Sequence, residues 1–236
     1  MHMSESIQEE VSFRTVGWDD LDMITAAFDR VWPQVGELDG TPTGALLARY
    51  NALHYMSLTT TGKIALVNNG AGFNEDGDGE FAGVCLVRVF GQPQLFPQAE
   101  AAMEEMRPLI AANPRGRLAL DSLEGVFWRN ERYLEENNDS NNPDNNQAEL
   151  ELFMVSPDVR GMGVGGTLWR DMMDTLRAAG AHAFYLHTGS DCDYSFYEYK
   201  GLERTAERFH ADHPEDNDEP YLPPVDMFIY RGVVAD

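Results

Sequence analysis

The chain has 236 residues, 43% of them hydrophobic, which is enough for one sizeable core and favours a single domain. Forty acidic residues against seventeen basic ones give a net charge of −23 at pH 7, which argues against nucleic-acid binding because a phosphate backbone needs a cationic face. The same charge either serves solubility alone or raises the local concentration of cationic small molecules. No apolar run reaches the roughly 18 residues of a membrane span, and two cysteines suit a reducing cytoplasm, where we expect the protein.

The first 90 residues alternate between helical and strand patterns. Hydrophobic spacing predicts helices over 19–32 and 41–58, with Thr43 as a candidate cap of the second helix. Alternating and β-rich runs predict strands over 11–18, 63–68 and 80–90, and the last two suggest a hairpin around the polar residues 69–79.

The following segment, 91–147, is less regular and reads as an insertion. A helix is expected over 96–113, interrupted at Pro108. Residues 135–147 carry no apolar side chain, which predicts a mobile surface loop.

Regular patterns return after residue 147. We expect strands over 148–155, 181–189 and 225–234, a helix over 163–180, and a further helix or helix-turn over 193–209. The whole order predicts a mixed α/β fold whose densest signal lies between 149 and 209.

The stretch SPDVRGMGVGGTLW, residues 156–169, places a glycine-rich turn between a strand and a helix. Such glycines let backbone N–H groups approach a pyrophosphate, and the helix N-terminus adds positive character. If the motif is Gly-x-Gly-x-x-Gly beginning at Gly161, it is the pattern of a dinucleotide-binding turn. That interpretation also needs a strand running directly into the first glycine, an acidic residue after the next strand and several more βα units. Only the second requirement is met, by Asp191.

A different division of the same stretch fits better. Strand, Val-x-Pro, a short turn and then Arg160-Gly-x-Gly-x-Gly opening a helix resembles the acetyl-CoA-binding motif of the GNAT acetyltransferase superfamily. A second segment, FYEYKGLER at 196–204, resembles the family's Phe-Tyr-Glu-x-x-Gly-Phe, with Leu202 in place of the last Phe. The resemblance covers residues 149–209. It implies one GNAT-like domain over 1–236, with a mixed, mostly antiparallel central sheet flanked by helices and strands splayed at the CoA site.

The resemblance also implies which residues hold the acetyl-CoA co-substrate. The backbone of the strand before the loop would pair with the pantetheine arm, and the loop amides would hold the pyrophosphate, helped by the arginine. Alternatively, Arg160 is a solvated residue at the start of the helix or an ion-pair partner of Asp158. The expected cofactor-binding residues are Phe153, Met154, Val155, Arg160, Gly161, Met162, Gly163, Val164, Gly165 and Gly166.

Acetylation of an amine by direct attack needs a base for the amine and an acid for the leaving thiolate. Glu149 and Glu151 are candidates for the base, directly or through water, and strand alternation puts both on one face with Phe153 and Val155. Tyr197 matches the tyrosine that family members use to protonate the thiolate. Alternatively, the two glutamates are only polar residues of the strand. Because other tyrosines are close in sequence, Tyr197 could equally belong to an aromatic helix face that packs in the core.

Other residues give weaker signals. His187 at a strand end is a second candidate base, although such histidines are more often structural, and Cys192 has no partner pattern of a nucleophile. The histidines and cysteines show no metal-ligand spacing, so we expect no metal. Candidates for the acceptor site are Trp18, Trp32, Tyr50, His54, Tyr55, Trp128, Glu131 and Tyr133.

The sequence therefore predicts an N-acetyltransferase that acts on a primary amine of a small molecule or peptide and binds no metal. A cationic acceptor is one of the two interpretations of the negative charge. A non-catalytic acyl-CoA-binding module and, more remotely, a nicotinamide-dependent oxidoreductase remain as alternatives. Dimers are common among proteins of this kind, so a homodimer is compatible with the resemblance.

Overall fold

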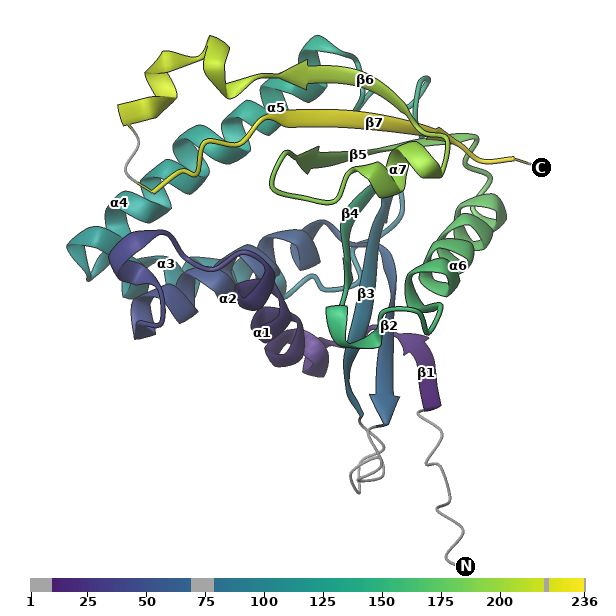
Figure 1. The fold of residues 1–236 in the computed structure, drawn as a ribbon, viewed down its shortest axis with the longest axis horizontal. Helices are drawn as coiled ribbons and strands as arrows, with labels where there is room; N and C mark the ends of the chain where they lie inside the picture. Colours follow the sequence, from purple (N-terminus) through teal and green to yellow (C-terminus); the bar gives the residue numbers. More distant parts are fainter. Residues whose placement is uncertain (1–9, 69–78, 219–220, 236) are drawn as a thin grey trace, which may run out of the picture.

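The computed structural model describes residues 10–68, 79–218 and 221–235, which form a seven-stranded sheet with helices on both faces (Figure 1). Spatial strand order is β1-β2-β3-β4-β5-β7-β6. Only β4 and β5 pair in parallel, and all other pairs are antiparallel, so the expected mixed, mostly antiparallel sheet is confirmed. The strands are β1 (Glu10–Thr15), β2 (Thr61–Asn68), β3 (Glu80–Val89), β4 (Ala148–Val155), β5 (Ala183–Gly189), β6 (Glu203–Arg208) and β7 (Met227–Val233).

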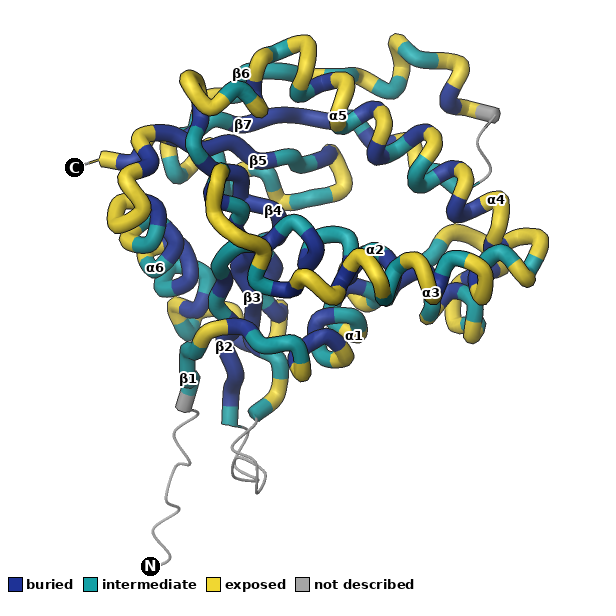
Figure 2. Tube along the Cα trace, turned by 180° about the vertical axis from the view of Figure 1, so that it is seen from behind, coloured by how far each residue is buried: buried dark blue, intermediate teal, exposed yellow. Residues whose placement is uncertain are grey.

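Seven α-helices occur in the described residues, and they divide between the two faces of the sheet. One core cluster joins α1, α2, α3 and α4 to side chains such as Ile64 and Leu86, and the second packs α6 against side chains such as Val67 and Val87. Figure 2 shows the burial along the strands between these layers. The helices are α1 (Leu21–Val31), α2 (Pro42–Leu58), α3 (Ala99–Ala111), α4 (Pro114–Ser122), α5 (Trp128–Asn137), α6 (Val164–Ala178) and α7 (Ser195–Tyr199).

Segment 91–147 is more regular than its sequence pattern indicates, because it consists largely of α3, α4 and α5. The expected interruption at Pro108 is wrong: α3 continues to Ala111, since a proline in the last turn removes a hydrogen bond without ending the helix. A π-helical turn, Leu123–Phe127, joins α4 to α5.

The expected loop at 135–147 begins later than its composition suggests. Residues 135–137 still belong to α5. Beyond the helix, Ser140 and Asn146 are buried, and the Asn146 side-chain amide donates to the Ser140 carbonyl at 2.8 Å. Hydrogen bonds within this asparagine-rich turn therefore replace the apolar contacts that its sequence lacks.

Two further expectations need correction. The cap of α2 is Thr41 instead of Thr43, because the Thr41 hydroxyl accepts from the Gly44 amide at 3.0 Å. Residues 193–209 are not one helix: α7 ends before Gly201, whose φ of 79° breaks the helix, and β6 then pairs with β7. Within the described residues, no helix is both long and apolar enough to cross a membrane.

Candidate active site

A β-bulge in β4 shapes the centre of the site. Leu152 pairs with Leu86 and Leu150 with Val87, so Glu151 is an extra residue in β4. The bulge reverses the alternation, because Leu150 joins the core beside α6 while Leu152 and Met154 join the opposite core. The expectation that one face carries Glu149, Glu151, Phe153 and Val155 is therefore wrong, since a regular two-residue period does not survive an inserted residue.

The parallel pairing of β4 with β5 ends at the same level. It comprises Ala148 to Leu150 against Phe184 to Leu186, after which β5 continues beside β7. Residues Phe153 to Val155 pair with β3 on their other edge. Their backbone groups facing β5 are thus left for a ligand to pair with, in the splayed arrangement that we expected.

A cavity of about 1130 Å3 opens along this splay, between the sheet, α1, α2, α5 and the loop before α6. Of the expected cofactor-binding residues, Met162 and Gly166 lie outside its lining, and the other eight are within it. The three expected catalytic residues also line it: Glu149, Glu151 and Tyr197.

The glycine loop holds the N-terminus of α6 against the cavity. Gly161 and Gly163 have φ of 89° and 77°, which favour glycine for backbone reasons alone. Gly163 is the N-cap of α6, and its carbonyl accepts the first bond of the helix from the Thr167 amide at 3.0 Å. The amides of residues 164–166 precede that bond and have no partner inside the helix, which suits an anion.

Gly165 differs from these two glycines because the fold does not require it. Its φ is not in the left-handed region, and a Cβ there would reach only ordinary van der Waals contact, 3.4 Å from Val155 Cγ2. A Cβ at this position would instead occupy the cavity, because Gly165 lines it. The loop thus fits a pyrophosphate that needs close approach to the backbone.

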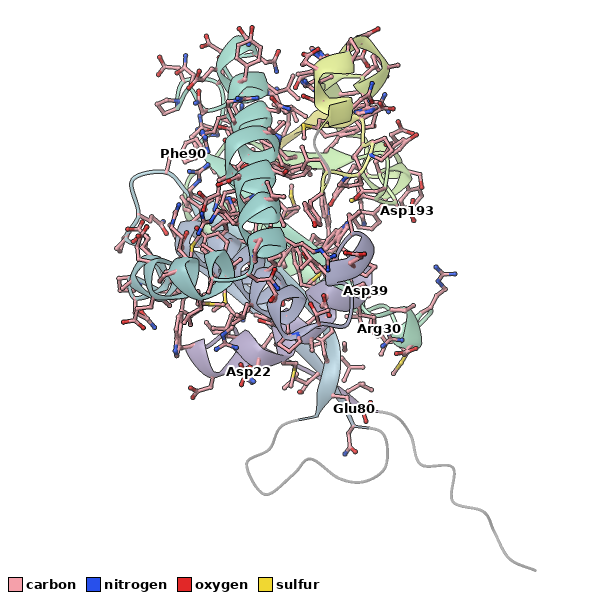
Figure 3. All side chains as sticks on the ribbon, turned by 90° about the vertical axis from the view of Figure 1, so that its left-hand side faces the viewer. Asp22, Arg30, Asp39, Glu80, Phe90 and Asp193 are labelled. Carbon is pink, nitrogen blue, oxygen red and sulfur yellow. The ribbon has the colours of Figure 1, made fainter. Side chains whose placement is uncertain are left out.

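Arg160 is exposed at the mouth of the loop and makes no ion pair with any residue in the described part of the chain. The alternative partner for it, Asp158, is held instead by Arg30 of α1, which is labelled in Figure 3, at an Nη1–Oδ2 distance of 2.9 Å. Arg160 therefore keeps its guanidinium available to a phosphate.

Arg88 of β3 joins the two candidate base residues. Its Nη2 pairs with Glu149 Oε2, and its Nε lies 2.8 Å from Glu151 Oε1, a contact whose geometry makes an ion pair without a hydrogen bond. The Tyr185 hydroxyl adds a hydrogen bond to Glu149 at 2.8 Å. Burial, followed by the charge of Glu149, raises the pKa of Glu151 well above its usual value, whereas the charge of Arg88 acts in the opposite direction.

The network continues to α5 through the same tyrosine. Glu135 Oε1 lies 3.1 Å from the Tyr185 hydroxyl and 2.9 Å from His187 Nε2. Although burial opposes a charge on His187, the hydrogen bond to Glu135 and the nearby carboxylates raise its pKa to about 9. His187 is therefore protonated at neutral pH and pairs with Glu135, which argues against its use as a base.

Glu135, Glu149 and His187 also bring three potential metal-ligand atoms within 4.8 Å of one another. In this structure the same atoms are engaged by the Tyr185 hydroxyl, by Arg88 and by each other. The arrangement is a hydrogen-bonded ionic network.

Three neighbouring tyrosines are distinguished by their positions. Tyr199 is 84% exposed, and Tyr194 packs against Phe228, whereas Tyr197 lines the cavity. Burial raises the pKa of Tyr197, so the phenol keeps its proton. Its hydroxyl makes no hydrogen bond to another described residue, which leaves it free to donate to a ligand.

The candidate acceptor-site residues also divide into those that line the cavity and those that do not. Trp18 packs against Phe96, Tyr50 is fully buried against Glu124, and Tyr133 is 64% exposed, so these three lie outside the cavity. Its lining includes Trp32, His54, Tyr55, Trp128 and Glu131.

Sequence reasoning missed Arg88, Tyr185 and Glu135. Arg88 is the one charged residue in the apolar run 81–90, which was a usable signal. Tyr185 and His187 alternate on β5, but nothing local connects them with Glu135 across about 50 residues of chain.

Comparison with known proteins finds one partial family match and a shared fold. A family model described as Acetyltransferase (GNAT) family matches residues 127–201. Among solved structures, mosquito arylalkylamine N-acetyltransferase like 5b shares 14% identity and a TM-score of 0.55, with 95% of this chain and 100% of that chain covered. Drosophila melanogaster polyamine N-acetyltransferase shares 12% identity and a TM-score of 0.54, with coverages of 95% and 100%.

An agmatine N-acetyltransferase shares 13% identity and a TM-score of 0.55, with 94% of this chain and 99% of that chain covered. No curated protein matches the sequence. The matched segment contains α5, β4, the glycine loop and Tyr197. The chain thus resembles the GNAT family over residues 127–201, and it shares its fold with these solved N-acetyltransferases.

Proposed function

We propose that this chain is an acetyl-CoA-dependent N-acetyltransferase that acetylates a primary amine of a small molecule or peptide by direct attack. The observation that carries the proposal is one cavity lined by the glycine loop, the open edge of β4, Tyr197 and the Glu149–Glu151 pair. The amine acceptors in the names of the structural neighbours, polyamine, agmatine and arylalkylamine, support the same kind of reaction.

Each part of the chain has a role in this proposal. Acetyl-CoA supplies an activated acetyl group and a thiol leaving group. The amides at the start of α6 and Arg160 bind its pyrophosphate, and the backbone of residues 153–155 binds its pantetheine arm. We extend the proposal to one GNAT-like domain over 1–236, located in the cytoplasm, where the free Cys85 and Cys192 would stay reduced.

We assign the general base to Glu149, because the raised pKa of Glu151 favours the protonated form of that side chain. Glu149 takes a proton from the amine, directly or through water, and Arg88 and Tyr185 hold its carboxylate in place. Tyr197 donates a proton to the leaving sulfur. The amide and a free thiol are then the products.

Two measurements test the proposal. Acetyl-CoA is expected to raise the melting temperature in a thermal-shift assay, whereas NAD and NADP leave it unchanged. Thiol release is then followed over a panel of amines, amino acids and peptides. Stabilisation by acetyl-CoA without amine-dependent thiol release would favour a binding module, and stabilisation by NAD alone would overturn the acyltransferase assignment.

A further inference from the structure

Helix α5 turns one face towards the acceptor side of the cavity. Trp128, Glu131 and Glu135 are spaced three and four residues apart, which places them on one side of the helix, and all three line the cavity. Tyr133 and Glu136 point elsewhere, since both are exposed. The helix therefore contributes two carboxyl groups and an indole to the wall.

Glu131 stands apart from the other carboxyl groups of this wall. Glu149 and Glu151 contact Arg88, and Glu135 contacts His187. Glu131 makes no hydrogen bond or ion pair with any residue that the structure describes. The guanidinium of the adjacent Arg132 lowers the pKa of Glu131 from a distance but is itself exposed and does not pair with it.

An unpaired carboxylate in such a cavity destabilises the folded protein, because burial disfavours its charge. Burial, as the largest cause, raises the pKa of Glu131 to about 7. Arg88 and His187 pair with Glu149 and Glu135, and the other cations of the lining, Arg132 and Arg160, are exposed and make no ion pair with Glu131. A cationic group of a ligand would restore the balance and ionise Glu131 fully.

The surrounding wall suits an alkyl chain that ends in a cation. His54 stacks on Trp128 with ring centroids 3.8 Å apart, and Tyr55 lines the cavity beside them. Burial lowers the pKa of His54 to about 4, so its ring is neutral at pH 7 and does not repel a cation. Aromatic faces attract such groups.

We propose that Glu131 is an anionic subsite for a second cationic group of the acceptor. The substrates are then aliphatic diamines or guanidino-alkylamines, whose reacting amine lies at Glu149 while the distal cation lies at Glu131. The inference rests on the proposed acetyltransferase function and adds the chemical class of its acceptor.

The test compares 1,5-diaminopentane with pentylamine, which differ in one charged group. We expect kcat/KM to favour the diamine by about tenfold or more in the wild type, and Glu131→Gln to abolish most of this preference. Glu131→Asp, which keeps the charge, should retain part of it. Glu136→Gln, on the exposed side of the same helix, is the matched control and should behave as the wild type.

Calorimetric titration of the CoA-saturated protein with the two amines gives a readout that does not require catalysis. Weaker diamine binding in Glu131→Gln, with unchanged pentylamine binding, would support the subsite. An undiminished diamine preference in Glu131→Gln, or no preference in the wild type, would overturn it. Amine binding without any thiol release would overturn the acetyltransferase function while leaving the subsite measured.

Discussion

At the scale of single residues, the glutamate side chains that line the cavity have different environments. Burial raises the pKa of Glu151 and of Glu131, while Glu149 and Glu135 contact cationic or hydroxyl partners. Identical side chains thus receive different roles from their neighbours.

Tyr197→Phe removes the proposed proton donor without altering the ring packing around it. We expect turnover in a thiol-release assay to fall by about 100-fold, because general acid catalysis contributes on that order. Acetyl-CoA affinity should not change. Tyr199→Phe, at an 84% exposed position, is the control, and equal turnover in the two variants would remove Tyr197 from the mechanism.

The raised pKa of Glu131 predicts that the free energy of unfolding depends on pH. Its pKa is about 7 in the folded protein against 4.5 for a free side chain, so the folded state binds more protons between these values. The stabilising contribution is therefore complete below about pH 4.5 and is lost as the pH rises through 7. From pH 5 to 8, the free energy of unfolding should fall by on the order of 2 kcal/mol more in the wild type than in Glu131→Gln. Parallel curves from urea denaturation would contradict this.

At the scale of elements, the site depends on three interruptions of regular structure: the bulge in β4, the end of the β4–β5 pairing and the left-handed turn before α6. The bulge re-aims Glu151, the splay exposes a strand edge, and the turn directs the amides of a helix N-terminus at the cavity. These irregularities leave backbone groups free to bind a ligand, because regular strand pairing or helical hydrogen bonds would have engaged the same groups.

Two glycines of this turn should respond oppositely to alanine. Gly163→Ala should lower the free energy of unfolding by about 1 kcal/mol, because φ of 77° strains a side chain. Gly165→Ala should not destabilise the protein, since a Cβ has room and alanine favours a helix, but it should weaken acetyl-CoA binding. Thermal melts with and without acetyl-CoA measure both effects. Unchanged acetyl-CoA affinity in Gly165→Ala would argue against the phosphate role of the loop.

At the scale of the whole molecule, the charge of −23 acts on both substrates with opposite sign. If the acceptor is cationic, its KM should rise several-fold from about 20 mM to about 500 mM salt, because screening shortens the range of attraction. The KM of the anionic acetyl-CoA should fall or stay constant. Steady-state kinetics at several salt concentrations measure both, and a parallel rise for the two substrates would show that salt acts on the enzyme itself.

The sequence alone was enough to predict the donor side that we propose for this protein. The glycine turn, the strand before it and Tyr197 lie within about 50 residues, so local patterns were enough to indicate the fold class and the cofactor. Only the tertiary structure brings together the candidate acceptor side of the cavity. The bulge that turns Glu151 arises from pairing between β3 and β4, and the Arg88–Glu149–Tyr185–Glu135–His187 network joins three strands and a helix. Contacts between distant segments produce no periodic pattern in the sequence. Burial, which raises the pKa of Glu131 and Glu151, exists only once the chain has folded.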